Sequence, residues 1–112
     1  MSKRDSKLLI RDILISINKI KVYTENKTYE SFMVDELVKD AVVRNIEIIG
    51  EASNRIPDDL KSKSQNIPWS KLRGIRNRIV HDYFGVDYSI IWFIIENELI
   101  PLETELQILL SD

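Results

Sequence analysis

The residues of this chain best suited to chemistry lie in one short stretch, RNRIVHDY, at positions 76–83. It contains the only histidine of the chain, His81, five residues after Arg76 and two before Tyr83. Histidine has an ordinary pKa of about 6.5, so it can accept or donate a proton near neutral pH. A guanidinium group stabilises negative charge on phosphoryl oxygens through paired hydrogen bonds. This pair of side chains therefore suits the cleavage of a phosphodiester, a reaction that requires no metal.

RNA is the substrate class that fits this chemistry, because its 2′-hydroxyl can attack the neighbouring phosphate. A base must take the hydroxyl proton, and an acid must protonate the leaving 5′-oxygen. One histidine cannot fill both roles in the same step. A symmetric dimer that places two copies of the motif side by side would supply both groups. We therefore expect a site that is shared between two subunits.

The predicted position of the motif on a helix decides which of its side chains face one another. At 100° per residue, Asn77 and His81 share one face of a helix, whereas Arg76 and His81 lie about 140° apart. Within one subunit, Arg76 and His81 would then point in different directions. A dimer could relieve this mismatch by bringing Arg76 of one subunit toward His81 of the other.

The motif adjoins a basic stretch. Residues 58–78 contain six lysines and arginines against two aspartates, a local charge of +4 in a chain whose net charge is −2. This local charge favours a polyanion as partner, although the whole chain lacks the bulk positive charge of a general nucleic-acid binder. The candidate RNA-binding residues of the stretch are Lys71, Arg73 and Arg78.

Structural roles for the motif residues stay open at this point. A lone histidine near a helix C-terminus is often a partner of the helix dipole or a surface residue. Arg76 could pair with Glu47 or Glu51 of the preceding helix. Asn77 could bond to the helix backbone, and Tyr83 could be an aromatic residue at the edge of the core.

The composition is that of an ordinary globular domain. With 112 residues, of which 44% are hydrophobic and 30% charged, the chain can bury one core. The absence of cysteine excludes disulfides and thiolate metal ligands and is compatible with a reducing cytosol. No signal peptide is recognisable, and the longest apolar run, residues 90–95, is far shorter than the about 20 residues of a membrane helix. We expect one cytoplasmic domain over residues 1–112, with no cofactor, metal or membrane.

Hydrophobic periodicity predicts helices throughout the chain. We expect one helix over about 6–22 and a second over about 32–55, followed by a short helical turn and loop over 57–67. A third helix should run from Pro68 to Gly85, and a fourth should begin at a cap on Asp87 and run to about 110. Pro101 should kink or break the fourth helix. The predicted fold is an all-α, up-and-down bundle of four to five helices.

The fourth predicted helix is apolar on every side over residues 90–95, IIWFII. A surface helix of a monomer needs only one apolar stripe, so this helix should be covered on more than one face. A second copy of the chain could supply the extra cover. The sequence therefore predicts a homodimer, formed through the face of the motif helix.

Arg76-Asn77, His81 and Tyr83 together resemble the R-x4-H-x-Y motif of the HepT-like toxins, a branch of the HEPN superfamily. Three further stretches are similar to the same family. They are EIIGEA at 47–52, IPW at 67–69 with Gly74, and DYFGVDYSIIW at 82–92. The resemblance covers roughly residues 31–110.

This resemblance implies a helical homodimer whose motif helices line a shared cleft. It also implies a metal-independent endoribonuclease that is the toxin of a type VII-like toxin–antitoxin pair. By position, Arg76 and His81 would be catalytic, and Asn77 would help to orient the site. Tyr83 would accept AMP groups from the cognate antitoxin, a small nucleotidyltransferase of the MntA type. The added phosphate would bring negative charge and bulk to the place where RNA phosphates must enter.

Two other functions are alternatives. A non-catalytic helical dimer could serve only to bind the nucleotidyltransferase, using the apolar run at 90–95, but such a scaffold has no need of Arg76 and His81. A helix-turn-helix DNA binder would read bases with the third helix. The N-terminal end of that helix lacks the exposed side chains that would read bases, because Trp69 and Leu72 stand there. This composition argues against a DNA binder.

Overall fold

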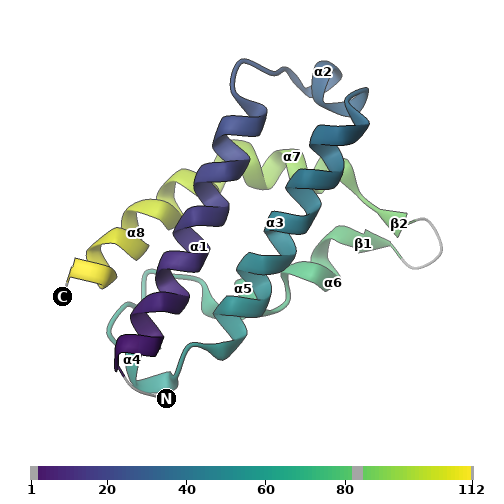
Figure 1. The fold of residues 1–112 in the computed structure, drawn as a ribbon. Helices are drawn as coiled ribbons and strands as arrows, with labels where there is room; N and C mark the ends of the chain where they lie inside the picture. Colours follow the sequence, from purple (N-terminus) through teal and green to yellow (C-terminus); the bar gives the residue numbers. More distant parts are fainter. Residues whose placement is uncertain (1–2, 82–84, 112) are drawn as a thin grey trace.

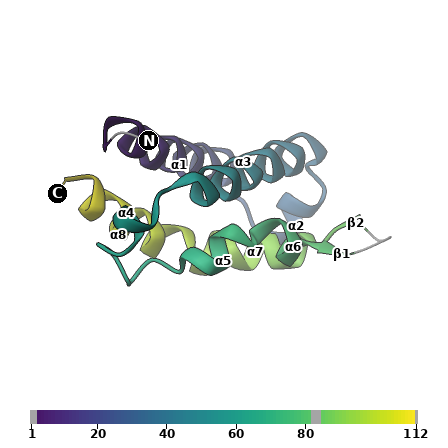
Figure 2. The same ribbon diagram turned by 90° about the horizontal axis from the view of Figure 1, so that it is seen from below.

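The computed structural model describes the backbone of residues 3–81 and 85–111, and the side chains of residues 5–80 and 85–111. Within these residues the fold is all-α apart from one small hairpin. The long helices α1 (Lys3–Thr24) and α3 (Glu36–Arg55) lie antiparallel in one layer, and the second layer contains the C-terminal half of the chain (Figure 1; Figure 2). No helix among the described residues is both long and apolar enough to cross a membrane.

The core lies between these two layers. Ile10, Ile13, Ile17 and Ile20 recur along α1 at steps of three and four residues and are fully buried. The facing stripe of α3 and the inner sides of the second layer complete the core. Their buried members include Val42, Ile46, Ile49, Ile75, Ile79, Ile91, Ile94 and Leu106.

The predicted second helix is two helices, α2 (Tyr29–Met33) and α3, because Asp35 interrupts it. The backbone N–H of Val38 donates to Oδ1 of Asp35 at 3.1 Å, which caps α3. Nζ of Lys27 donates to Oδ2 of the same carboxylate at 2.9 Å, and this hydrogen bond holds the pKa of Asp35 below its ordinary value. The short side chain of Asp35 thus accepts a hydrogen bond from the backbone three residues later and marks the start of a new helix.

The prediction of one helix from Pro68 to Gly85 is wrong after Ile79, where the helical segment ends. The chain forms α4 (Asp58–Lys61) in the preceding loop, then α5 (Trp69–Arg73) and α6 (Ile75–Ile79). It continues as β1 (Val80–His81), which pairs antiparallel with β2 (Gly85–Val86). Gly85 has a φ of 77°, so this glycine supports the hairpin and does not terminate a helix. The predicted angle of 140° between Arg76 and His81 therefore does not apply.

The predicted fourth helix begins and breaks as expected, giving α7 (Tyr88–Asn97) and α8 (Leu99–Ser111). Oδ1 of Asp87 accepts hydrogen bonds from the backbone N–H groups of Ser89 and Ile90, which confirms the predicted cap. The break falls at Glu98. Pro101 then lies in the first turn of α8, where the N–H that proline lacks has no helical acceptor.

Gly50 of α3 allows the motif segment to approach α3 closely. A Cβ at position 50 would lie 2.9 Å from Cγ2 of Ile75 and 3.5 Å from the carbonyl oxygen of Leu72. Any larger side chain would push α5 and α6 away from α3. The glycine of the EIIGEA stretch therefore sets the distance between α3 and the helix that bears Arg76.

Gly50→Ala should lower the free energy of unfolding by about 1 kcal/mol, because overpacking costs ~1–3 kcal/mol and alanine regains ~1 kcal/mol of helix propensity. Urea unfolding followed by circular dichroism measures the change. Gly74→Ala is the matched control, since its Cβ would meet only the Ser70 carbonyl oxygen at an ordinary 3.5 Å. Equal stability of the Gly50→Ala variant and the wild type would contradict the close packing.

Candidate active site

Arg76 lies on α6 and borders an open groove between α3 and the α5–α6 segment. The groove has a volume of about 480 Å³, and α3 contributes Glu47, Gly50, Glu51 and Asn54 to its lining. Arg76 is exposed and shares the groove with both glutamates, yet it forms no ion pair with either. The interpretation of Arg76 as a fixed structural partner of Glu47 or Glu51 is therefore not supported.

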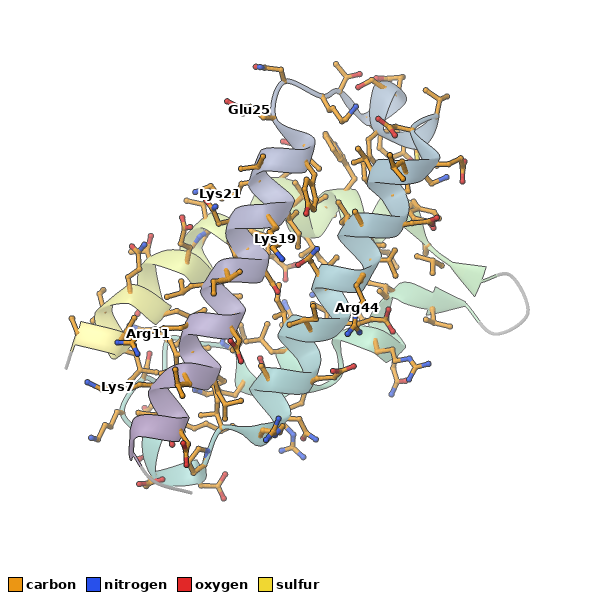
Figure 3. The ribbon with its side chains drawn as sticks, in the orientation of Figure 1. Lys7, Arg11, Lys19, Lys21, Glu25 and Arg44 are labelled. Carbon is orange, nitrogen blue, oxygen red and sulfur yellow. The ribbon has the colours of Figure 1, made fainter. Side chains whose placement is uncertain are left out.

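The charges around this groove are balanced. Arg73 and Arg76 line one wall, and Glu47 and Glu51 line the other. Nη1 of Arg44, which Figure 3 labels on α3, lies 3.8 Å from Oε1 of Glu51 and offsets part of that negative charge. A polyanionic strand in the groove would thus place its phosphates on the arginine side, because the carboxylates repel them. Its uncharged sugars and bases would lie nearer to α3.

His81 comes from a different element than Arg76. Its backbone lies in β1, where its Cα is the partner of Gly85. The hairpin is fastened at its base by a hydrogen bond of 2.7 Å from the backbone N–H of Asp87 to the carbonyl oxygen of Ile79. The side chain of His81 and the whole of Tyr83 lie outside the described residues.

The remaining predicted site residues divide into two groups. Asn77, Lys71 and Arg73 are exposed on α5 and α6. The amide of Asn77 makes no hydrogen bond to another described residue, so the alternative role of a bond to the helix backbone is not supported. Arg78, by contrast, is only partly exposed and is held by the carboxylate of Glu98, at the break between α7 and α8.

The guanidinium of Arg78 forms a forked ion pair with Glu98. Nη1 donates to Oε1 at 2.8 Å and Nη2 donates to Oε2 at 2.5 Å, and both side chains are 27% exposed. These hydrogen bonds lower the pKa of Glu98 against the opposing effect of burial, and they raise the pKa of Arg78. Nothing in the sequence singled out Glu98 for this role. The pair joins residues twenty positions apart, and only the fold brings them together.

No group of three or more histidine, cysteine, aspartate or glutamate side chains among the residues with described positions could hold a metal ion. The groove offers instead guanidinium groups, an amide and a hydroxyl. These groups can bind and orient a phosphodiester by hydrogen bonds and charge.

Comparison with known proteins finds one family of similar sequences. The family model described as Ribonuclease HepT-like matches residues 13–109. The chain is 40% identical over 108 residues to “Putative RNase MJ1380” of Methanocaldococcus jannaschii, which covers 96% of this chain and 99% of that protein. It is 37% identical over 101 residues to “Probable ribonuclease HepT” of Thermococcus cleftensis, and this match covers 90% of this chain and 92% of that protein. No solved structure matches the chain.

The Arg78–Glu98 pair should make stability depend on acid pH. The pair holds the pKa of Glu98 below its ordinary value of 4.5, so its contribution is fully present above that pH and is lost as pH falls through the lowered pKa. Wild type should therefore lose thermal stability more steeply than Glu98→Gln below about pH 4.5. Melting curves over about pH 3 to 6 test this, and parallel curves for the two proteins would contradict it.

Proposed function

The chain belongs to the HepT-like ribonuclease family, and from that premise we propose that it is a metal-independent endoribonuclease. One observation carries the proposal. Arg76 stands exposed beside an open groove, without an ion pair to either glutamate of that groove, five residues before the only histidine of the chain. Such an arginine is free to take a phosphate.

The proposed reaction is a transesterification within the RNA strand. The 2′-oxygen attacks the adjacent phosphorus, an imidazole takes its proton, and the bond to the 5′-oxygen breaks. A protonated imidazole gives its proton to the leaving oxygen, so the products are a 2′,3′-cyclic phosphate and a 5′-hydroxyl. Arg76 stabilises the charge on the phosphoryl oxygens, and Asn77, next to it on α6, helps to orient the strand.

We propose that His81 of each of two subunits supplies one of the two imidazoles. The position of His81 on a hairpin supports this arrangement, since Figure 1 shows β1 and β2 projecting beyond the helices. Val80 on β1 and Phe93 on α7 are 40% and 53% exposed, which leaves apolar surface for a second copy to cover. Lys71 and Arg73 would guide the RNA toward this shared cleft.

We further propose that the protein is the toxin of a toxin–antitoxin pair and that a small nucleotidyltransferase of the MntA type neutralises it. AMP groups on Tyr83 would place phosphate charge two residues from His81, where it would repel an entering RNA strand. The alternative function is that of a non-catalytic helical dimer that only binds such a transferase. The guanidinium of Arg76, which forms no ion pair with another described residue, favours the enzyme.

His81→Ala and Arg76→Ala should each reduce RNA cleavage at least ~100-fold, because each removes a proton-transfer group or a charge-stabilising group. The assay uses total RNA in the presence of a chelator. Arg11→Ala is the matched control, since this exposed arginine lies on the side of α1 away from α6 (Figure 3). Undiminished cleavage by His81→Ala would refute the catalytic assignment, and transferase binding without any cleavage would favour the scaffold.

Tyr83→Phe should cleave RNA about as fast as wild type but should resist neutralisation by the transferase, because it lacks the hydroxyl that accepts AMP. Cleavage is measured before and after incubation with ATP and the transferase, and mass spectrometry locates the adduct. An adduct on another residue, with Tyr83 unmodified, would contradict this assignment.

A further inference from the structure

We propose that the Arg78–Glu98 ion pair is a clasp that positions the arginine–histidine motif for catalysis, an inference that rests on the proposed function. The clasp joins α6, which bears Arg76, to the junction of α7 and α8. Arg78 is therefore a positioning residue and not an RNA-binding residue.

The clasp closes a ring of chain that contains the hairpin. From Arg78 the chain leaves α6, passes through β1 and β2, and returns along α7 to Glu98. The ring is pinned at one end by the bond from Asp87 to Ile79 and at the other by the clasp. With both ends of α7 tied to α6, the base of the hairpin cannot shift along α6 without breaking a hydrogen bond.

The same pair orients Arg76. Residues two apart on a helix point about 200° away from each other, so Arg76 and Arg78 emerge from nearly opposite sides of α6. Glu98 holds Arg78 on the side of α7, and Arg76 borders the groove beside α3. Two parallel hydrogen bonds fix the rotation of a guanidinium as well as its distance. A clasp of this kind limits rolling of α6, which would turn Arg76 out of the groove.

The clasp also removes Arg78 from the set of groups that can hold RNA. Both Nη atoms already donate to Glu98, at 2.8 and 2.5 Å, and the side chain is only 27% exposed. A phosphate at the remaining N–H groups of this guanidinium would have to compete for its charge with a carboxylate that already makes two charge-assisted bonds.

A second interhelical ion pair provides a matched control. Nζ of Lys21 on α1 donates to Oε1 and Oε2 of Glu103 on α8, at 2.9 and 3.2 Å (Lys21 is labelled in Figure 3). This pair joins helices that carry none of the motif residues. Glu103→Gln should cost a similar amount of stability as Glu98→Gln, which separates positioning from simple destabilisation.

The test compares steady-state RNA cleavage by wild type, Glu98→Gln, Glu103→Gln and the charge-swapped double variant Arg78→Glu/Glu98→Arg. Glu98→Gln should lower kcat about tenfold and leave KM within about twofold, because the reacting groups are misplaced while the RNA-binding residues are intact. Glu103→Gln should leave both constants unchanged. The double variant should recover part of the lost kcat. Circular dichroism checks that each variant is folded.

A contact between Arg78 and RNA would give the opposite pattern. Glu98→Gln would then free the guanidinium and lower KM, whereas Arg78→Ala would raise KM and weaken the salt dependence of binding by about one charge. Either result overturns the clasp, as would an equal loss of kcat in Glu103→Gln.

A separate measurement keeps the clasp testable if the wild type cleaves no RNA, which would refute the proposed function alone. The amide of Asp87, bonded to Ile79, should exchange its hydrogen about tenfold faster in Glu98→Gln than in wild type. It should exchange at the wild-type rate in Glu103→Gln. Unchanged exchange at Asp87 in Glu98→Gln would overturn the clasp independently of any activity.

Discussion

The end of α6 at Ile79 is the constraint on which the site depends. Had the helix continued to Gly85, Arg76 and His81 would have been fixed on different faces of one rigid rod. The chain instead turns into β1, so the arginine is carried by a helix and the histidine by a hairpin. Hydrogen bonding at Asp87 and the positive φ of Gly85 hold this change of direction in place. The backbone of His81 is thus placed relative to Arg76 by the hairpin and not by helical geometry.

Close packing determines the position of α6, and the charged residues around it determine the electrostatics of the groove. Gly50 lets α6 lie against α3, which places Arg76 beside the carboxylates of Glu47 and Glu51. Arg76 forms no ion pair with either of these carboxylates, and the two arginines and two glutamates that line the groove balance in charge. Lys71 and Arg73 carry exposed positive charge on α5, whereas Arg78 is paired with Glu98. The basic stretch seen in the sequence therefore offers less unpaired positive charge than its net charge of +4 indicates.

Local signals made much of the fold predictable. The first helix, the cap at Asp87 and the break near Pro101 each depend on residues close in sequence, and each is confirmed. Gly85 misled the prediction because glycine both ends helices and supports positive φ in hairpins. The motif itself could be found from residue types, but its geometry could not. The contact of Gly50 with Ile75 and the pairing of Arg78 with Glu98 arise only once distant segments pack together.

We propose that cleavage needs one imidazole from each of two subunits. This requirement is tested most directly by mixing wild-type and His81→Ala chains in varying proportion, allowing the subunits to exchange, and measuring RNA cleavage. If both imidazoles act in one shared site, mixed dimers are inactive and activity falls with the square of the wild-type fraction, to about a quarter in an equal mixture. A linear fall, to about half in the equal mixture, would mean that each subunit cleaves alone and would contradict the account.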